Sequence, residues 1–200
     1  MGKYDEAYWQ KLLSTSSPVP LMGVLERMVE SQEQAVTVRL TDSLAEHEVL
    51  EAILDESKPP VTRQLKRFDY LLRTPWRYPP LPWGSRFGRR FEPSLFYGSL
   101  TRSALLAESA YYRLLFLEGM SQPFPERVLS QHTVFQARFA SEQSYKLNDP
   151  PFARRARALM HPANYSAAQA LGTSIRESGG EVIQYWSARS PEKVLNVAPL

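Results

Sequence analysis

The stretch of residues 77–119 places the strongest constraint on what this chain can fold into. It runs from an arginine-rich turn region through a short apolar segment into the clearest predicted helix of the sequence. Thr101 or Ser103 can cap that helix, its interior contains neither glycine nor proline, and Gly119 followed by Pro123 ends it. We expect any functional site of the chain to lie in this stretch.

The predicted helix carries a carboxylate on the face that should pack inward. At about 100° per residue, Glu108 falls inside an apolar stripe. The stripe consists of Ala104, Leu105, Tyr111, Tyr112 and Leu115. An ionised carboxylate left alone on an apolar face is costly, so a donor must approach it. We expect an arginine to do so, because four of them lie upstream: Arg77, Arg86, Arg89 and Arg90.

Residues 94–98 (SLFYG) predict a brief strand between these arginines and the helix. Arg86, Tyr97 and Glu108 then lie on three successive elements. An arginine–glutamate pair beside a tyrosine is more often a structural ion pair than a catalytic site, so these residues alone favour a structural role. Their spacing leaves a catalytic role open.

Five short motifs resemble the RES domain family, which is named for its characteristic Arg, Glu and Ser. The motifs are GSRFG, LFYGS, ALLAESAYYR, SAAQALG and YWSAR, and the resemblance covers roughly residues 65–195. It implies a fold similar to that of ADP-ribosyltransferases and the function of a toxin in a bacterial toxin–antitoxin pair. It also implies an enzyme that consumes NAD, in some members by phosphorolysis.

The resemblance further implies which residues act. The family arginine matches Arg86, the tyrosine matches Tyr97, the glutamate matches Glu108 and the serine matches Ser187. Arg77 matches a second family arginine. The segment GSRFGRRF, which stands where many relatives carry a glycine-rich GGRW-type segment, resembles a longer subgroup. Arg86, Tyr97 and Glu108 are therefore the predicted catalytic residues, and Arg77 and Ser187 are predicted to bind the substrate.

The implied chemistry is cleavage of the bond between nicotinamide and ribose in NAD. Positive charge develops at the anomeric carbon, and the carboxylate of Glu108 would stabilise it. Arg86 and Arg77 would bind pyrophosphate or incoming phosphate through charge-assisted hydrogen bonds. Tyr97 would stack on nicotinamide or the ribose, and Ser187 would orient the ligand.

Tyr78 is a further candidate for substrate binding. It stands with Trp76 and Trp83 in an aromatic loop rich in proline, which can be the edge of a core or one wall of a ligand cleft. Both alternatives remain. Neither a glycine-rich dinucleotide motif nor a P-loop occurs, so NAD would not bind as in a Rossmann domain.

The acceptor is not fixed by these residues, because phosphate, water or a protein side chain would attack the same carbon. Inorganic phosphate suits the arginine cluster, so we predict an NAD phosphorylase before an NAD glycohydrolase. An ADP-ribosyltransferase that modifies a protein target is one alternative, and a non-enzymatic interaction module is another. The family also implies an Xre-like antitoxin partner with a DNA-binding helical domain, in a homo- or hetero-oligomer.

Composition excludes several other classes of protein. The chain has no cysteine, which removes disulfides, thiolate metal sites and cysteine nucleophiles and suits a cytoplasmic protein. Its formal charge of +3 is small for 200 residues, so direct nucleic-acid binding is not predicted. No run approaches a membrane span. The spacing of His132 and His161 suggests no metal site, and we predict neither a metal nor a cofactor.

We predict an α+β fold with a compact mixed or antiparallel sheet core and flanking helices. Residues 1–60 are predicted to form a helical N-terminal extension that packs on the main domain or mediates self-association, and residues 61–200 to form the RES domain. The predicted helices cover residues 4–13, 21–29, 41–56, 104–117, 153–160 and 165–177. The predicted strands cover residues 35–40, 94–98, 133–140, 145–147 and 182–186.

Overall fold

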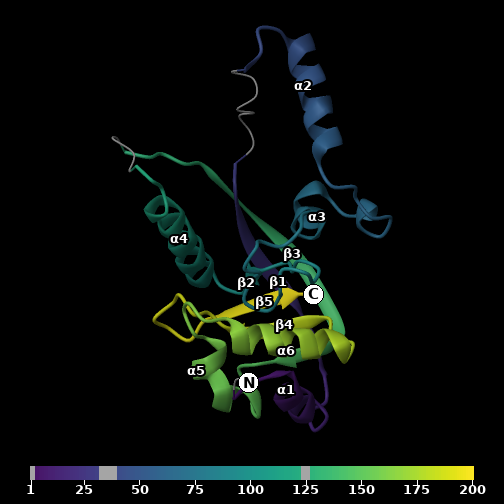
Figure 1. The fold of residues 1–200 in the computed structure, drawn as a ribbon, viewed down its shortest axis with the longest axis vertical. Helices are drawn as coiled ribbons and strands as arrows, with labels where there is room; N and C mark the ends of the chain where they lie inside the picture. The colour runs from purple at the N-terminus through teal and green to yellow at the C-terminus, as the bar shows by residue number, and fades with distance from the viewer. Residues whose placement is uncertain (1–2, 32–39, 123–126) are drawn as a thin grey trace.

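The strands of this protein close into a single mixed sheet (Figure 1). The computed structural model describes residues 3–31, 40–122 and 127–200. In these ranges the strands are β1 (Val19–Glu30), β2 (Gly98–Ser99), β3 (His132–Lys146), β4 (Val182–Trp186) and β5 (Leu195–Pro199). Their order around the closed sheet is β1-β2-β5-β4-β3. Neighbouring strands are antiparallel except for β3 and β4, which are parallel.

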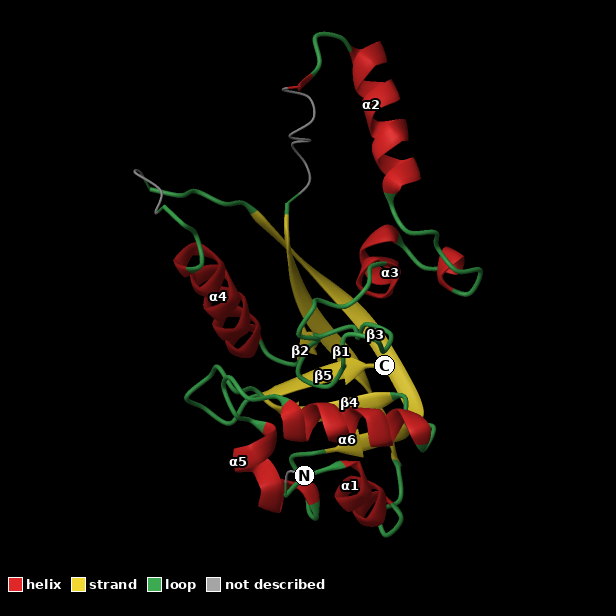
Figure 2. Cartoon of the chain, in the orientation of Figure 1, coloured by secondary structure: helices red, strands yellow, loops and turns green. Residues whose placement is uncertain are grey.

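Some of the helices pack against this sheet, and others extend away from it (Figure 2). The helices are α1 (Glu6–Leu13), α2 (Leu44–Ser57), α3 (Tyr70–Arg77), α4 (Arg102–Glu118), α5 (Ala156–Leu159) and α6 (Ser166–Glu177), with short 3-10 turns at Leu65–Arg67 and Phe152–Arg155. In Figure 2, α6 lies across β4 with α1 and α5 beside it, and α2 stands away from the sheet. The helix α4 contacts β1 and β2 and then extends outward. The predicted combination of a mixed sheet with flanking helices is therefore confirmed, but its closure into a barrel was not predicted.

The segment before residue 60 contains a strand where apolar spacing predicts a helix. The predicted helix over residues 21–29 is wrong, because these residues belong to β1. β1 pairs with β3 from Val19 opposite Ser144 to Glu30 opposite His132. The apolar residues of β1 fit the period of a helix as well as that of a strand. Pairing with β3, far downstream in the sequence, therefore determines the conformation of β1. The N-terminal extension is therefore not purely helical, and the strand predicted over residues 35–40 lies outside the described residues except at Leu40.

Two other predicted strands differ from the observed ones. The strand expected over residues 94–98 is wrong for most of its length, because only Gly98 and Ser99 form β2. The segments 133–140 and 145–147 were expected to be two separate strands, but residues 132–146 are one continuous strand. The expected helices at 4–13, 41–56, 104–117 and 165–177, the helical turn at 153–160 and the strand at 182–186 are confirmed within a few residues.

The core lies between the sheet and α6 and continues to α1. Trp9 of α1 is fully buried beside Leu171 and Ile175 of α6 and Ile183 of β4. Burial of each large side chain contributes roughly 1.5–3 kcal/mol, so α1 is an integral part of the fold. A second cluster joins Leu25, Phe96, Val182 and Val197 inside the closed sheet. Among the described residues, no helix combines the length and the hydropathy needed to cross a bilayer.

Candidate active site

The loop that carries Arg86 depends on two glycines. Gly84 has a φ angle of 72°, in the left-handed region that side chains rarely adopt. The loop also rests against α6, where a Cβ atom on Gly172 would lie 2.0 Å from the carbonyl oxygen of Phe87. Glycine at position 172 therefore allows the loop and the helix to approach closely, and this contact fixes the position from which Arg86 extends.

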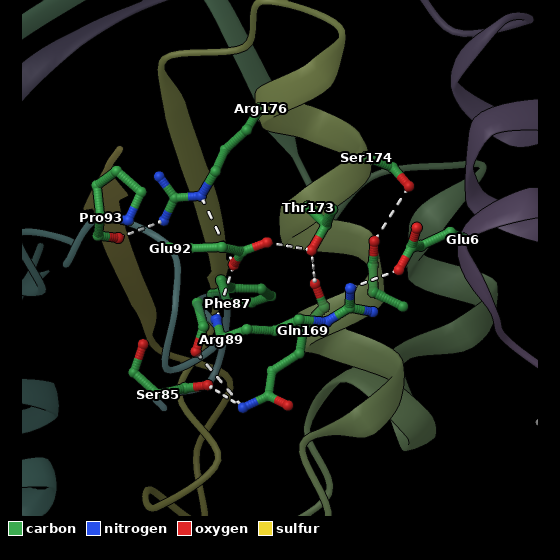
Figure 3. A network of polar contacts seen from close by, with 12 residues as sticks. Glu6, Ser85, Phe87, Arg89, Glu92, Pro93, Gln169, Thr173, Ser174 and Arg176 are labelled. Atoms are coloured by element: carbon green, nitrogen blue, oxygen red, sulfur yellow. Dashed lines mark hydrogen bonds and ion pairs between the residues drawn. The ribbon is translucent and has the colours of Figure 1, made fainter. Parts of the chain in front are cut away.

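Side chains of α6 hold the same loop through hydrogen bonds (Figure 3). Gln169 Nε2 donates to the carbonyl oxygens of Trp83 and Ser85, both at 3.0 Å. Glu92, which follows the loop, accepts a hydrogen bond from Thr173 Oγ1. Because these contacts come from one helix that is part of the core, the loop is held by a rigid support.

Arg86 is a buried cation without a carboxylate partner. Its side chain is 6% exposed, and Nη1 donates to the carbonyl oxygens of Leu159 at 3.0 Å and His161 at 3.2 Å. Its guanidinium carbon lies 4.8 Å from the centre of the Tyr165 ring. Nη2 is buried and has no hydrogen-bond partner. Within the described residues Arg86 forms no ion pair, so it is well suited to receive an anionic ligand.

Tyr97 connects the Arg86 loop to β1. Its hydroxyl lies 2.8 Å from Ser85 Oγ and accepts a hydrogen bond from the amide of Phe87 at 3.0 Å. Its carbonyl oxygen accepts from Arg27 Nη1 at 2.6 Å. Burial raises the pKa of Tyr97, so its hydroxyl stays neutral at physiological pH. Since the hydroxyl is already engaged, the ring is the part of Tyr97 that can contact a ligand.

Glu108 is held by two neutral donors. Its Oε1 atom accepts hydrogen bonds from Ser187 Oγ at 2.6 Å and from Asn196 Nδ2 at 2.8 Å. Both donors are buried, whereas Glu108 itself is partly exposed. The expected arginine partner is wrong, because no cation in the described chain forms an ion pair with Glu108. Neutral donors suffice since the carboxylate borders an open cavity, and they leave its negative charge intact.

The hydroxyl of Ser187 acts as the donor in its contact with Glu108, because its oxygen already accepts two hydrogen bonds. Ser187 directly follows β4, and its Oγ accepts hydrogen bonds from the amides of Arg189 at 3.1 Å and Ser190 at 3.3 Å. A hydroxyl has a single proton, so that proton is directed at the carboxylate. The turn after β4 thereby orients the carboxylate of Glu108.

An open cavity of about 780 Å³ brings the predicted catalytic residues together. Arg86, Tyr97 and Glu108 all line it, and Ser187 supports it from behind Glu108. The aromatic rings of Tyr111, Tyr112, Tyr165 and Tyr185 also face this space. The volume lies within the roughly 300–1,000 Å³ of small-molecule sites, and a few convergent polar groups among aromatic walls are typical of them.

The other two predicted substrate-binding residues lie elsewhere. Arg77 Nε donates to the carbonyl oxygen of Pro59 at 2.6 Å, and Arg77 does not line the large cavity. Tyr78 lines a neighbouring cavity of about 300 Å³ that shares Arg27 and Tyr97 with the large one. Their roles in substrate binding remain predictions.

Sequence reasoning missed two residues of this site. Asn196 lies on β5, which was not predicted, although one polar residue within the apolar run 194–198 was a usable signal. Arg27 lies on β1, where the expected helix gave no reason to place it near Tyr97. In the described chain no three potential metal ligands lie together, and the absence of a metal remains a prediction.

The fold and the cavity define a small α+β domain in which the carboxylate of Glu108 and the buried guanidinium of Arg86, which forms no ion pair within the described residues, line the same space. The RES domain family model matches residues 60–199, and the chain belongs to this family. The resemblance found in the sequence is therefore confirmed.

The fold is similar to that of a chain in the crystal structure of the M. tuberculosis MbcT–MbcA toxin–antitoxin complex. The TM-score is 0.53 at 9% sequence identity, and the match covers 96% of this chain and 80% of the other. The structural similarity therefore extends into the segment before residue 60, which the family model does not include. No curated protein is significantly similar in sequence.

Proposed function

We propose that this protein is the toxin of a type II toxin–antitoxin pair and that it cleaves the nicotinamide–ribose bond of NAD, by phosphorolysis in preference to hydrolysis. The observation that carries the proposal is the state of Glu108. Its carboxylate is fixed by Ser187 and Asn196, forms no ion pair with a cation of the described residues, and lines a cavity that also holds Arg86. A fixed negative charge in such a cavity serves a reaction in which positive charge develops.

The main requirement of the proposed reaction is the negative charge of Glu108 beside the anomeric carbon. The bond between the anomeric carbon and the pyridinium nitrogen breaks, and nicotinamide leaves as a neutral base with the bonding electron pair. The ribose then carries oxocarbenium character, which Glu108 stabilises more strongly than it stabilises the substrate. A phosphate oxygen forms the new bond to the same carbon. With water as the acceptor, the same step would release one proton.

Phosphate is the favoured acceptor because of Arg86. The guanidinium has a buried Nη2 without a protein partner, and one face of it lies against Tyr165. An oxyanion in the cavity that Arg86 lines would offset the cost of burying this cation. Water would provide a hydrogen bond but no compensating charge.

An antitoxin is the proposed protein partner. The structural neighbour comes from a toxin–antitoxin complex. In addition, the exposed surface of α4 beside the cavity is strongly apolar, with Phe116 63% exposed, Leu115 49% exposed and Tyr112 48% exposed. These three residues also line the cavity, so a protein bound on them would cover its entrance.

The proposal is tested by incubating the purified protein with NAD, with and without inorganic phosphate, and following nicotinamide and the ribosyl product by mass. Phosphate-dependent release with a phosphorylated ADP-ribose product is expected. The Glu108→Gln variant should fold and lose at least about 100-fold in rate, because the amide retains an oxygen for Ser187 and Asn196 but lacks the charge.

Glu118→Gln is the matched control, since it makes the same change at an exposed position of the same helix. Release that is equally fast without phosphate would identify a glycohydrolase instead. A label that moves from NAD to a protein would identify an ADP-ribosyltransferase. An absence of both NAD binding and turnover would contradict the enzymatic proposal.

A further inference from the structure

The turn that follows β4 contains an arginine whose side chain lies behind the wall of the large cavity. Arg189 is half-buried and does not line the cavity, but it contacts two tyrosines that do. Its guanidinium carbon lies 3.5 Å from the centre of the Tyr111 ring, and Nη2 donates to the hydroxyl of Tyr165 at 2.8 Å. The same nitrogen donates to the carbonyl oxygen of Pro162 at 2.8 Å. Arg189 therefore joins the loop before α6 to α4.

Tyr165 connects Arg189 to Arg86. The hydroxyl of Tyr165 accepts from Arg189, and its ring lies 4.8 Å from the guanidinium carbon of Arg86. The carbonyl oxygens that accept from Arg86 belong to Leu159 and His161, which precede Tyr165 in the same loop. The position of this loop and of the Tyr165 ring therefore sets the plane in which the Arg86 guanidinium meets a ligand.

The backbone of Arg189 acts on the opposite side of the cavity. Its amide donates to Ser187 Oγ at 3.1 Å, and Ser187 in turn donates to Glu108 at 2.6 Å. Every residue except proline supplies this amide, whereas the contact with Tyr165 requires the arginine side chain. A substitution at position 189 therefore removes the support of the Tyr165 ring and leaves the donor to Glu108 in place.

The contacts of the Arg189 side chain require a planar group more than they require a charge. Within the described residues Arg189 forms no ion pair, and its Nε is buried without a hydrogen-bond partner. A guanidinium can stack on an aromatic ring and donate hydrogen bonds in its own plane at the same time. These are the two kinds of contact that Arg189 makes with the tyrosines of the wall.

We propose that Arg189 is a positioning residue of the cavity: it acts through Tyr165 on Arg86, and so sets the affinity for the anionic group that Arg86 binds, without changing the orientation of Glu108. The inference rests on the proposed function, in which Arg86 binds a phosphoryl group. Arg189 itself makes no contact with the substrate in this role.

Steady-state kinetics on Arg189→Met in the full chain gives the first test. Methionine retains the backbone amide and an unbranched side chain but has no donor. The KM for the ligand whose phosphoryl group Arg86 binds, either phosphate or NAD, should rise by at least about fivefold, because the guanidinium is misplaced. The kcat should change by less than about twofold, since Ser187 still holds Glu108. Unchanged KM values, or a loss confined to kcat, would overturn the proposal.

Two further variants separate positioning from charge and from packing. Arg189→Lys keeps the charge without the planar group and should recover only part of the affinity. Arg155→Met is the matched control, because Arg155 donates to the Tyr8 hydroxyl at 2.6 Å and to the carbonyl oxygen of Pro151 at 2.9 Å, and neither Arg155 nor Tyr8 lines the cavity. Arg155→Met should lower the free energy of unfolding and leave both KM values unchanged. Equal KM increases in Arg155→Met and Arg189→Met would contradict a positioning role.

Tyr165→Phe tests the proposed connection and does not depend on the folding of Arg189→Met. The variant keeps the ring that lies against Arg86 but lacks the hydroxyl that Arg189 binds. The same KM should rise, and the double variant should be no worse than Arg189→Met alone, because both changes break one connection. A Tyr165→Phe variant with unchanged KM values, or effects that multiply in the double variant, would overturn the proposal.

Calorimetry with inorganic pyrophosphate as the probe distinguishes this inference from the proposed function. If the unmodified protein binds pyrophosphate, and both Arg189→Met and Tyr165→Phe weaken that binding, the positioning role stands even when NAD is not cleaved. Cleavage of NAD with the KM values of both variants unchanged has the opposite meaning. A protein that neither binds pyrophosphate nor cleaves NAD would overturn both proposals.

Discussion

The hydroxyl of Ser187 lies 2.6 Å from Oε1 of Glu108, at a hydrogen-bond distance that joins the turn after β4 to the middle of α4. Removal of this donor should hold Glu108 less firmly, because only the hydrogen bond from Asn196 would remain among the described residues. We expect Ser187→Ala to lower kcat for NAD cleavage by about tenfold with little change in KM, since a hydrogen bond to a charged group is worth roughly 1.5–3 kcal/mol.

Steady-state kinetics on Ser187→Ala and Ser174→Ala checks this prediction. Ser174 is as deeply buried as Ser187, but its hydroxyl donates to the carbonyl oxygen of Ala170 within α6. Ser174→Ala should therefore leave kcat unchanged. Equal losses in both variants would show that the effect comes from packing and not from the orientation of Glu108.

Tyr97→Phe should reduce both stability and substrate binding. The variant loses the hydroxyl that accepts from the amide of Phe87 and contacts Ser85. An unsatisfied buried amide costs roughly 1–3 kcal/mol in the free energy of unfolding, which chemical denaturation would detect. Because the loop carries Arg86, the KM for NAD should rise as well. Tyr145→Phe removes a much weaker hydroxyl contact, to Ser178 Oγ at 3.4 Å, and should cost less.

Gly172→Ala should destabilise the protein although alanine is the better helix former. The new Cβ would lie 2.0 Å from the carbonyl oxygen of Phe87, so the Arg86 loop must move away from α6. We expect a loss of roughly 1–3 kcal/mol in the free energy of unfolding, measured by denaturant titration. At Gly119 a Cβ would meet nothing closer than 3.5 Å, and Gly119→Ala should be nearly neutral. Similar stabilities of the two variants would contradict the close contact.

The ion pair between Glu26 and Arg102 should make the free energy of unfolding depend on pH in the acidic range. Hydrogen bonds from Arg102, aided by Gln136, lower the pKa of Glu26 below its ordinary value of 4.5. A carboxyl with a lowered folded-state pKa stabilises the fold above the unfolded-state value, and this contribution is lost as the pH falls through the folded-state value. Between pH 6 and pH 3, Glu26→Gln should therefore lose less stability than the unmodified protein.

Thermal unfolding across this pH range, with and without 1 M salt, measures the effect. Because the pair is solvent-accessible, the difference between the two proteins should shrink in salt. A pH dependence that is the same in both proteins would exclude a contribution from Glu26.

Local sequence signals were sufficient to predict most of the helices. Thr101 caps α4 by accepting from the amide of Ala104, as a threonine before a run of helix formers predicts. Glu108 was identified from its place within an apolar stripe. That stripe, however, lines a cavity over much of its length instead of packing on the core, which explains why Leu115 and Tyr112 are about half exposed.

The features that the sequence could not predict depend on pairing between strands far apart in the chain. Leu25 and Arg27 lie two residues apart on β1, and the pairing with the partner strand β3 makes that segment extended. Asn196 reaches Glu108 because β5 lies between β2 and β4, an order that no local pattern contains. The donors to Glu108 could therefore be predicted only in part, through the resemblance that indicated Ser187.

The position of β5 between β2 and β4 has a consequence for synthesis of the protein. A ribosome releases α4 and Glu108 well before it releases residues 195–199, and until then Glu108 has no Asn196 and the sheet cannot close. A nascent chain is therefore without the finished cavity, even when most of the RES domain has emerged. For a protein proposed to consume NAD, activity would then begin only after β5 has left the ribosome.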